Sequence, residues 1–206
     1  MSRIVLATHN RGKVAELHRI LGDLDVVGLD EFPGAPDVAE TELTFEGNAF
    51  LKARAIAAFT GLPAVADDSG LSVDALNGMP GVLSARWSGR FGAATGDRDT
   101  ANLQLLLDQL ADVADDRRGG AFVCAAVLVV PGGAEHAVEG RMRGTVARAP
   151  RGTGGFGYDP IFVPDGETRT TAELAPAEKD AISHRGRAFR ELAGLIPAAL
   201  AAAGPS

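Results

Sequence analysis

The sequence is poor in several residue types, and each shortage excludes a class of protein. A single cysteine, Cys124, excludes an internal disulfide and a zinc site built from several cysteines. No apolar run approaches the roughly 18 residues that a membrane-spanning helix requires. Positive charge is also scarce, because 20 Lys and Arg residues stand against 27 Asp and Glu residues, for a net charge of −7. That balance argues against a nucleic-acid-binding surface, which would need a basic stripe.

The remaining composition is ordinary for a globular protein. Hydrophobic residues make up 46% of the chain and charged residues 23%, and 206 residues can bury a full core in one domain or two closely joined lobes. No charged leader precedes a signal-like apolar segment, and no internal repeat is visible. We therefore expect a soluble, cytoplasmic protein.

The rest of the chain is organised around an apolar run that ends in two adjacent carboxylates, Asp67 and Asp68. The pattern predicts a buried strand up to these residues, a turn at Ser69 and Gly70, and a returning strand over residues 71–74. Side chains alternate along a strand, so one carboxylate can face a cleft while the other supports the structure behind it. Such oxygen ligands suit magnesium and can accept a proton from water. An acidic turn between two strands explains this stretch equally well.

A polar turn follows the first predicted strand, residues 3–7, and precedes a helical pattern. The turn, residues 8–13, offers backbone N–H groups, the side chains of Thr8 and Asn10, and the charge of Lys13. A helix start of this kind can bind phosphate. Plain N-capping with an exposed lysine is the alternative interpretation. The spacing of a Walker loop is absent.

A glycine-rich loop at residues 151–159 contains the formal pattern G-x-G-x-x-G. Dinucleotide binding would require a helix directly after it, and Pro160 disfavours one, so we reject that interpretation. The loop instead presents Phe156, Tyr158 and Asp159, and aromatic faces stack on nucleobases. A surface loop with one buried anchor is the alternative.

The C-terminal region places His184 and Arg185 at the start of the last predicted helix, with Ser183 as its N-cap and Lys179 shortly before it. These donors can bind phosphates or base carbonyls. An exposed basic helix start without a ligand is the alternative interpretation. Further helices are predicted over residues 44–60 and from Asp97 or Asp99 onward, and a hairpin over residues 121–130 and 135–141. One more strand is predicted over residues 144–148. Together these elements predict an α/β protein with a mixed sheet covered by helices.

Five separated segments form a combination that is more specific than any one of them. They are Thr8-His9-Asn10-Arg11-Gly12-Lys13, Glu46-Gly47-Asn48-Ala49 with Lys52, Ala66-Asp67-Asp68-Ser69-Gly70-Leu71, Gly154-Gly155-Phe156-Gly157-Tyr158-Asp159-Pro160, and Ala181-Ile182-Ser183-His184-Arg185. In this order they resemble the motif set of the inosine/xanthosine triphosphate pyrophosphatase family. The resemblance runs from about Ile4 to Leu195.

The resemblance implies a fold and a reaction. The fold is a mixed central β-sheet flanked by helices in two lobes, with the active-site cleft between them, and residues 1–206 form a single nucleoside-triphosphate pyrophosphatase domain. The reaction is the magnesium-dependent hydrolysis of deaminated purine nucleoside triphosphates, namely ITP, dITP and XTP, to the monophosphate and pyrophosphate. A homodimer is implied as well.

The resemblance also implies roles for individual residues. Asp68 corresponds to the general base and a metal ligand, and Glu40 to a second metal ligand. Ser69 corresponds to a substrate contact. The implied phosphate contacts are Thr8, His9, Asn10, Arg11, Gly12, Lys13 and Lys52. The implied base contacts are Phe156, Gly157, Tyr158, Asp159, Lys179, His184 and Arg185.

Two rival functions remain open at this point. One is a pyrophosphatase for other modified nucleotides, which a substrate panel would distinguish. The other is a non-catalytic nucleotide-binding module, which would bind ligand without releasing pyrophosphate and would give no reason for Asp68 beside a phosphate loop.

Overall fold

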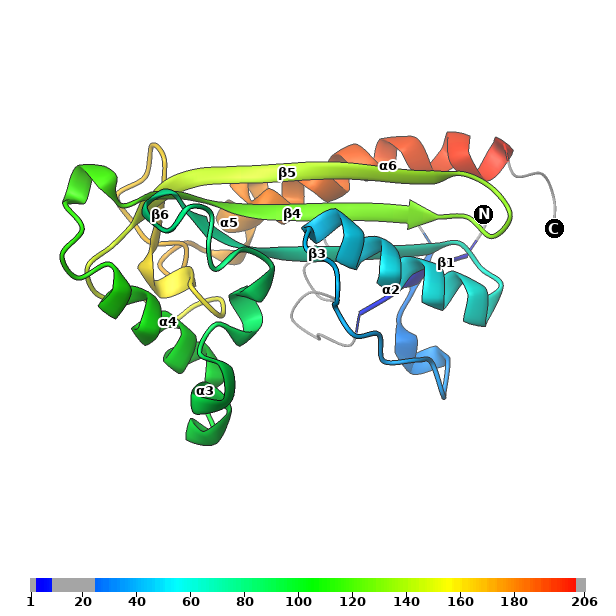
Figure 1. The fold of residues 1–206 in the computed structure, drawn as a ribbon. Coiled ribbons are helices and arrows are strands. Elements are labelled where there is room, and N and C mark those ends of the chain that lie inside the picture. The colour runs from blue at the N-terminus through cyan, green and yellow to red at the C-terminus, as the bar shows by residue number, and fades with distance from the viewer. Residues whose placement is uncertain (1–2, 9–24, 203–206) are drawn as a thin grey trace. The chain divides into compact units, whose positions relative to one another are not determined.

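In a computed structural model, residues 3–8 and 25–202 are described. In these ranges six strands form one sheet in the order β2-β1-β3-β4-β5-β6 (Figure 1). The strands are β1 (Ile4–Leu6), β2 (Val26–Val27), β3 (Ala64–Val73), β4 (Gly119–Val129), β5 (Glu135–Val146) and β6 (Phe162–Pro164). Strand β1 pairs in parallel with β2 and β3, whereas β5 and β6 are antiparallel. The predicted mixed sheet is therefore confirmed.

The helices of the described residues are α2 (Phe45–Thr60), α3 (Gly89–Thr95), α4 (Arg98–Gln109), α5 (Pro176–Ile182) and α6 (His184–Ala202). None of the helices in ranges 3–8 and 25–202 is long and apolar enough to cross a bilayer. The chain divides into two compact units. Unit 1 consists of Met1–Asp68, Cys124–Gly140 and His184–Ser206, and unit 2 of Ser69–Val123 and Arg141–Ser183. The predicted lobes with a cleft between them stay a prediction.

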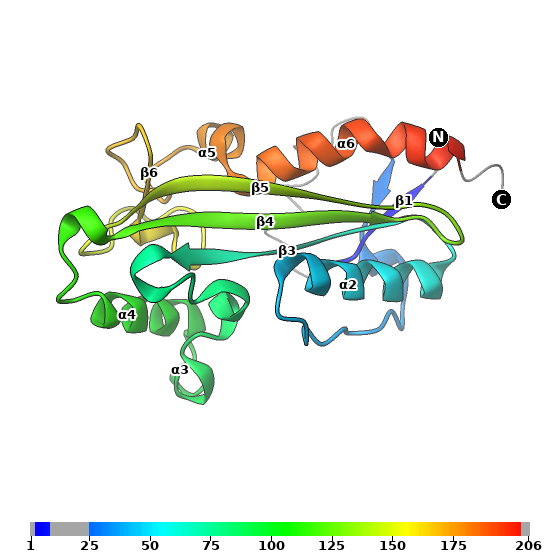
Figure 2. The same cartoon turned by 45° about the horizontal axis from the view of Figure 1, so that its top comes forward.

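In unit 1, helices α2 and α6 cover opposite faces of the strands (Figures 1 and 2). The cause is the alternation of side chains along each strand. Ile4, Leu6 and Val65 pack in one cluster with the inner face of α6, which is formed by Phe189, Leu192 and Ile196. Val5, Ala64 and Ala66 point the other way and pack with α2 through Ala49, Ala53 and Ile56. Phe189, Leu192 and Ile196 therefore form the buried face of α6.

Helix α2 begins and ends where the sequence predicts. Thr44 is its N-cap, and the threonine side chain accepts a hydrogen bond from the backbone N–H of Gly47 at 3.0 Å. Gly61 ends the helix in the left-handed region, at φ +70°, which glycine adopts without a steric penalty.

The core of unit 2 is built on α4. Asp97 caps this helix by accepting from the backbone N–H of Thr100 at 3.0 Å. Leu103, Leu106 and Leu110 are buried in a cluster that includes residues of β3, β4, β5 and β6, with Leu107 partly buried against it. The leucines of α4 therefore belong to the core of unit 2.

Strand β3 corrects the prediction for the acidic stretch. It runs without interruption through Asp67, Asp68, Ser69 and Gly70, so the predicted turn is wrong. Gly70 serves a close approach instead, because a Cβ there would lie against Ser84 Oγ and 2.6 Å from the Gly81 carbonyl oxygen. The strand predicted over residues 144–148 is also corrected, since its first part continues β5 to Val146. The sequence did not predict α3, α5 or β6.

Gly140 offers a test of packing between β5 and α6 in unit 1. A Cβ at Gly140 would lie against the His184 carbonyl oxygen and 2.7 Å from the Ala188 backbone nitrogen. Because backbone atoms cannot move aside cheaply, Gly140→Ala should lower the free energy of unfolding by about 1–3 kcal/mol. Urea denaturation measures this quantity. Gly194→Ala, at an open position of α6, is the matched control and should raise stability by up to about 1 kcal/mol. Equal stability of the two variants would contradict close packing at Gly140.

Candidate active site

Asp68 lies on the α2 side of β3, on the same face as Ala64 and Ala66, because every second residue of a strand shares a face. Its side chain is buried, with the residue only 6% exposed. Asn48 Nδ2 donates to Asp68 Oδ2 at 3.0 Å, and Lys52 Nζ lies 3.9 Å from Asp68 Oδ1. Asn48 and Lys52 are four residues apart on α2 and therefore share a helix face. This face presents an amide and an ammonium group to one carboxylate.

Lys52 connects Asp68 with a second carboxylate. Its Nζ donates to Glu40 Oε1 at 2.8 Å. Burial by itself would lower the pKa of Lys52, but attraction to Asp67, Asp68 and Glu40, together with the hydrogen bond to Glu40, outweighs burial and raises it. Lys52 therefore stays positively charged at neutral pH.

The donor set around Lys52 fits a magnesium ion. Asp68 and Glu40 flank the same ammonium group, and Mg²⁺ is commonly held by one or two carboxylates together with substrate phosphates and water. Within the described ranges no group of three or more His, Cys, Asp and Glu side chains could hold a metal by itself. A metal at this place would need further ligands, which substrate phosphates and water can supply.

Asp67 points to the opposite face of β3, toward α6. Arg185 Nε donates to Asp67 Oδ2 at 3.3 Å, and Cys124 Sγ lies 3.9 Å from the same oxygen. The side chains of Asp67 and Arg185 are 0% and 3% exposed. The prediction that the two aspartates diverge is confirmed. Arg185, expected at the base, is held in a buried ion pair, and His184 beside it is also buried.

In unit 2, a buried carboxylate gathers the residues predicted to bind the base. Asp159 Oδ2 accepts from the Phe156 backbone N–H at 2.8 Å and from Lys179 Nζ at 2.6 Å. Thr171 Oγ1 donates to Asp159 Oδ1 at 2.8 Å. Lys179 Nζ also lies 5.2 Å from the centroid of the Phe156 ring, whose residue is 43% exposed. Asp159 therefore fixes an exposed aromatic ring and an ammonium group next to each other.

Tyr158 differs from this group, although it was predicted in the same loop. It is 5% exposed, and its hydroxyl donates to the Ser84 carbonyl oxygen at 2.9 Å. Burial, with a smaller effect of Asp99, raises the pKa of Tyr158. Tyr158 is thus the buried anchor of the glycine loop, and only Phe156 offers a ring to solvent. A short 3₁₀ turn, Asp159–Ile161, and β6 follow the loop, so no α-helix begins directly after the loop, as the sequence predicted.

The other predicted site residues are spread along the chain. Thr8 follows β1, and its backbone N–H donates to the Leu6 carbonyl at 2.9 Å. Ser69 lies within β3, and the Gly157 backbone N–H donates to Asp99 Oδ2 at 3.0 Å. His9, Asn10, Arg11, Gly12 and Lys13 lie outside the described residues, so the phosphate turn stays a prediction.

Comparison with known proteins now supplies the family. Residues 4–195 match the Ham1 family. The chain belongs to this family. The family assignment made from sequence motifs is therefore confirmed.

Relatives of this chain carry the name dITP/XTP pyrophosphatase. The protein of Streptomyces coelicolor is 59% identical over 200 residues, which are 95% of this chain and 98% of the relative. The protein of Frankia alni is 60% identical over 195 residues, which are 94% and 96% of the two chains.

Solved structures of the Ham1 family share the fold. A HAM1 protein from Coxiella burnetii has a TM-score of 0.85 at 43% identity, over 97% of this chain and 100% of that one. A nucleoside-triphosphatase, dITP/XTP pyrophosphatase, from Mycobacterium abscessus has a TM-score of 0.75 at 57% identity, over 95% and 99%. The α/β fold with a mixed sheet is thus shared with its relatives.

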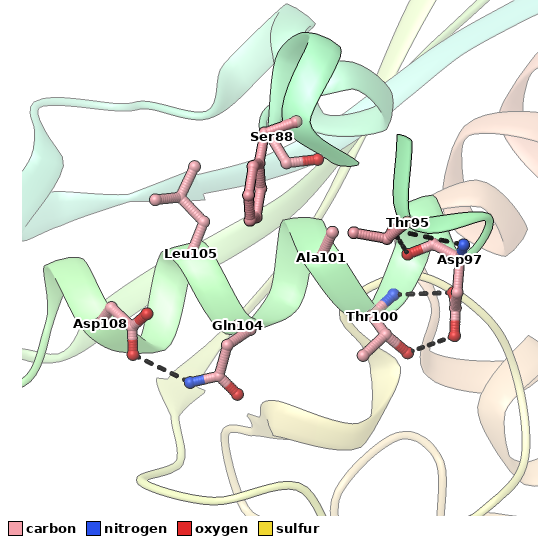
Figure 3. Close-up of a pocket in the computed structure, with 9 residues that line it drawn as sticks. Ser88, Thr95, Asp97, Thr100, Ala101, Gln104, Leu105 and Asp108 are labelled. Carbon is pink, nitrogen blue, oxygen red and sulfur yellow. Dashed lines mark hydrogen bonds between the residues drawn. The ribbon is translucent and has the colours of Figure 1, made fainter. Parts of the chain in front are cut away.

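A pocket in unit 2 holds none of the predicted site residues of this Ham1 protein. It has a volume of about 480 Å³ and lies against α3 and α4 (Figure 3). Two pairs of its polar side chains bond to each other, Thr100 to Asp97 and Gln104 to Asp108 (Figure 3). We therefore assign the candidate active site to the carboxylate clusters instead.

Sequence reasoning missed three residues that the carboxylate clusters use. Asn48 was named only as part of a family motif, although its spacing of four from Lys52 was a usable indication. Strand alternation predicted that Asp67 points away from Asp68, but no sequence pattern identified Arg185 as the partner of Asp67. No sequence pattern pointed to Thr171.

Breaking the Asp67–Arg185 pair should strongly lower the free energy of unfolding. Asp67→Ala leaves a buried guanidinium without its carboxylate, so the free energy of unfolding should fall by about 3–5 kcal/mol. Asp74→Ala is the control, because the Asp74–Arg143 pair is 55% and 52% exposed and such pairs contribute at most about 1 kcal/mol. Urea denaturation of both variants measures the difference. A loss for Asp67→Ala no larger than for Asp74→Ala would contradict the buried pair.

Proposed function

We propose that the protein hydrolyses the deaminated purine nucleoside triphosphates dITP, XTP and ITP to the monophosphate and pyrophosphate. The observation that carries this proposal is Asp68, a buried carboxylate held by Asn48 beside the charged Lys52. It supplies a proton acceptor next to a phosphate-binding cation. The names of relatives that are 59% and 60% identical over nearly the full chain support the substrate class.

Asp68 acts as the general base in this proposal. It takes a proton from a water molecule, whose oxygen forms a new bond to the α-phosphorus. The bond between the α-phosphorus and the bridging oxygen breaks, and pyrophosphate leaves with that oxygen and both electrons of the bond. Lys52 stabilises the negative charge of the phosphates, since its own charge persists at neutral pH. A positioned base of this kind contributes roughly 10²- to 10⁴-fold to the rate.

Magnesium is the proposed cofactor, with Asp68 and Glu40 as its protein ligands. When bound, the ion would neutralise phosphate charge and align the phosphate chain. The residues of the predicted phosphate turn, Thr8, His9, Asn10, Arg11, Gly12 and Lys13, are proposed to contact the phosphates, and Ser69 to contact the substrate.

Base recognition is assigned to an aromatic ring and several donors. Phe156 offers an exposed ring for stacking, beside the ammonium of Lys179. Hypoxanthine and xanthine carry an acceptor at C6, whereas adenine carries an amino group there. The N–H donors of Lys179 would satisfy the first two and leave adenine poorly paired, which can discriminate by about 10⁴-fold. Gly157, Tyr158 and Asp159 shape the loop that carries Phe156.

Three further assignments complete the proposal. We propose that residues 1–206 act as a single pyrophosphatase domain, that the protein forms a homodimer, and that it works in the cytoplasm, where it removes deaminated nucleotides from the pool. Light scattering in solution tests the dimer directly.

A substrate panel tests the proposed reaction. Pyrophosphate release from dITP, XTP, ITP, GTP and ATP is measured side by side, with magnesium and with EDTA. We expect magnesium-dependent release from the first three and little from GTP and ATP. Asp68→Asn is the catalytic control, which should melt like the parent and lose at least about 10²-fold in kcat. Binding without release would favour a nucleotide-binding module, and near-parental turnover of Asp68→Asn would show that another group is the base.

Asp159 gives a separate test of base recognition. Asp159→Asn weakens the hydrogen bonds that hold Lys179 and Phe156, so kcat/KM for ITP should fall about tenfold or more. Ribose 5-triphosphate, which has no base, should be hydrolysed by this variant at the parental rate. Equal losses on both substrates would mean that Asp159 serves general stability rather than the base.

A further inference from the structure

Asn48 is a buried polar side chain with both ends in use. It lies in the first turn of α2 and is 0% exposed. Its Oδ1 accepts from the Glu42 backbone N–H at 2.9 Å, and its Nδ2 donates to Asp68 Oδ2 at 3.0 Å. Burial of an amide costs free energy unless it is hydrogen-bonded. These two bonds therefore account for its place in the interior.

The chemistry of the partners fixes which way the amide faces. A backbone N–H can only donate, so the Asn48 oxygen must be the atom that faces Glu42. The NH₂ group is then directed to Asp68, and no reversal of the amide satisfies both neighbours. Asp68 Oδ2 must accept this hydrogen bond, which sets the rotation of the carboxylate about its bond to Cβ.

The geometry points to Asn48 as a positioning residue for Asp68. With Oδ2 held by Asn48, the carboxylate plane is fixed and Oδ1 is directed to the side of Lys52, 3.9 Å from Nζ. The segment before α2 is held close to the helix as well, since a Cβ at Gly47 would lie 2.8 Å from Glu42 Cβ. Asn48 thus ties this segment and α2 to the strand that carries the base. The inference rests on the proposed function only in calling Asp68 the base.

Support of the helix start does not explain these contacts. Thr44 already caps α2 through the Gly47 N–H, and the Asn48 backbone N–H donates to the Thr44 carbonyl at 3.1 Å. The Asn48 side chain adds nothing to this cap, and its donor is directed away from the helix to β3. Its position serves the carboxylate.

Asn48→Asp tests the donor with little change of shape. The new carboxylate can still accept from the Glu42 N–H but offers no amide donor to Asp68. We expect kcat for dITP to fall about 10- to 100-fold, as for other residues that orient a reactive group, while KM stays near the parental value. Thr44→Ala is the matched control, because it removes the α2 cap without touching Asp68. It should lower the thermal midpoint and leave kcat unchanged.

Three results would overturn the inference. They are parental kcat in Asn48→Asp, an equal loss of kcat in Thr44→Ala, or a loss confined to KM. Crystal structures of the parent and of Asn48→Ala decide the question without catalysis, since an Asp68 carboxylate in the same orientation in both would also overturn it. If the parent releases no pyrophosphate from dITP or XTP, the proposed function fails, and the structural comparison still decides the role of Asn48.

Discussion

The structure depends on the need to neutralise two adjacent carboxylates inside one strand. Because neighbouring side chains of a strand point to opposite faces, Asp67 and Asp68 cannot share a partner on one side. Asp68 meets Asn48 and Lys52 of α2, and Asp67 meets Arg185 of α6. Each carboxylate therefore has a polar or charged partner on the helix that covers its face of the strand.

Unit 2 also contains a buried carboxylate that polar neighbours compensate, and there it holds a loop and a lysine in place. Asp159 is 3% exposed and is compensated by Lys179, Thr171 and the backbone N–H of Phe156. The buried carboxylate of Asp159 holds these groups in place. Because this carboxylate is desolvated, the loss of any hydrogen bond to it costs free energy. In both units the residues suited to chemistry are fixed by neighbours that need not touch substrate themselves.

Local sequence patterns predicted several elements of the fold correctly. Helix α2 was predicted within a residue, since Thr44 and Gly61 are end signals that act within one turn. The turn at Ser69 and Gly70 was wrongly predicted because glycine after polar residues is typical of turns, whereas here its missing side chain admits the segment at Ser84. Tyr158 was expected to face a ligand, and only the packing of unit 2 revealed it as a core residue.

The sequence alone determined the family, the mixed α/β class and the divergence of Asp67 from Asp68, because motifs, periodicity and strand alternation depend on near neighbours. Only the tertiary structure decided the partners of these carboxylates. Asn48 is 20 residues from Asp68, and Arg185 is 118 residues from Asp67. Contacts over such separations follow from how helices pack on a sheet, and no local pattern of residues encodes them.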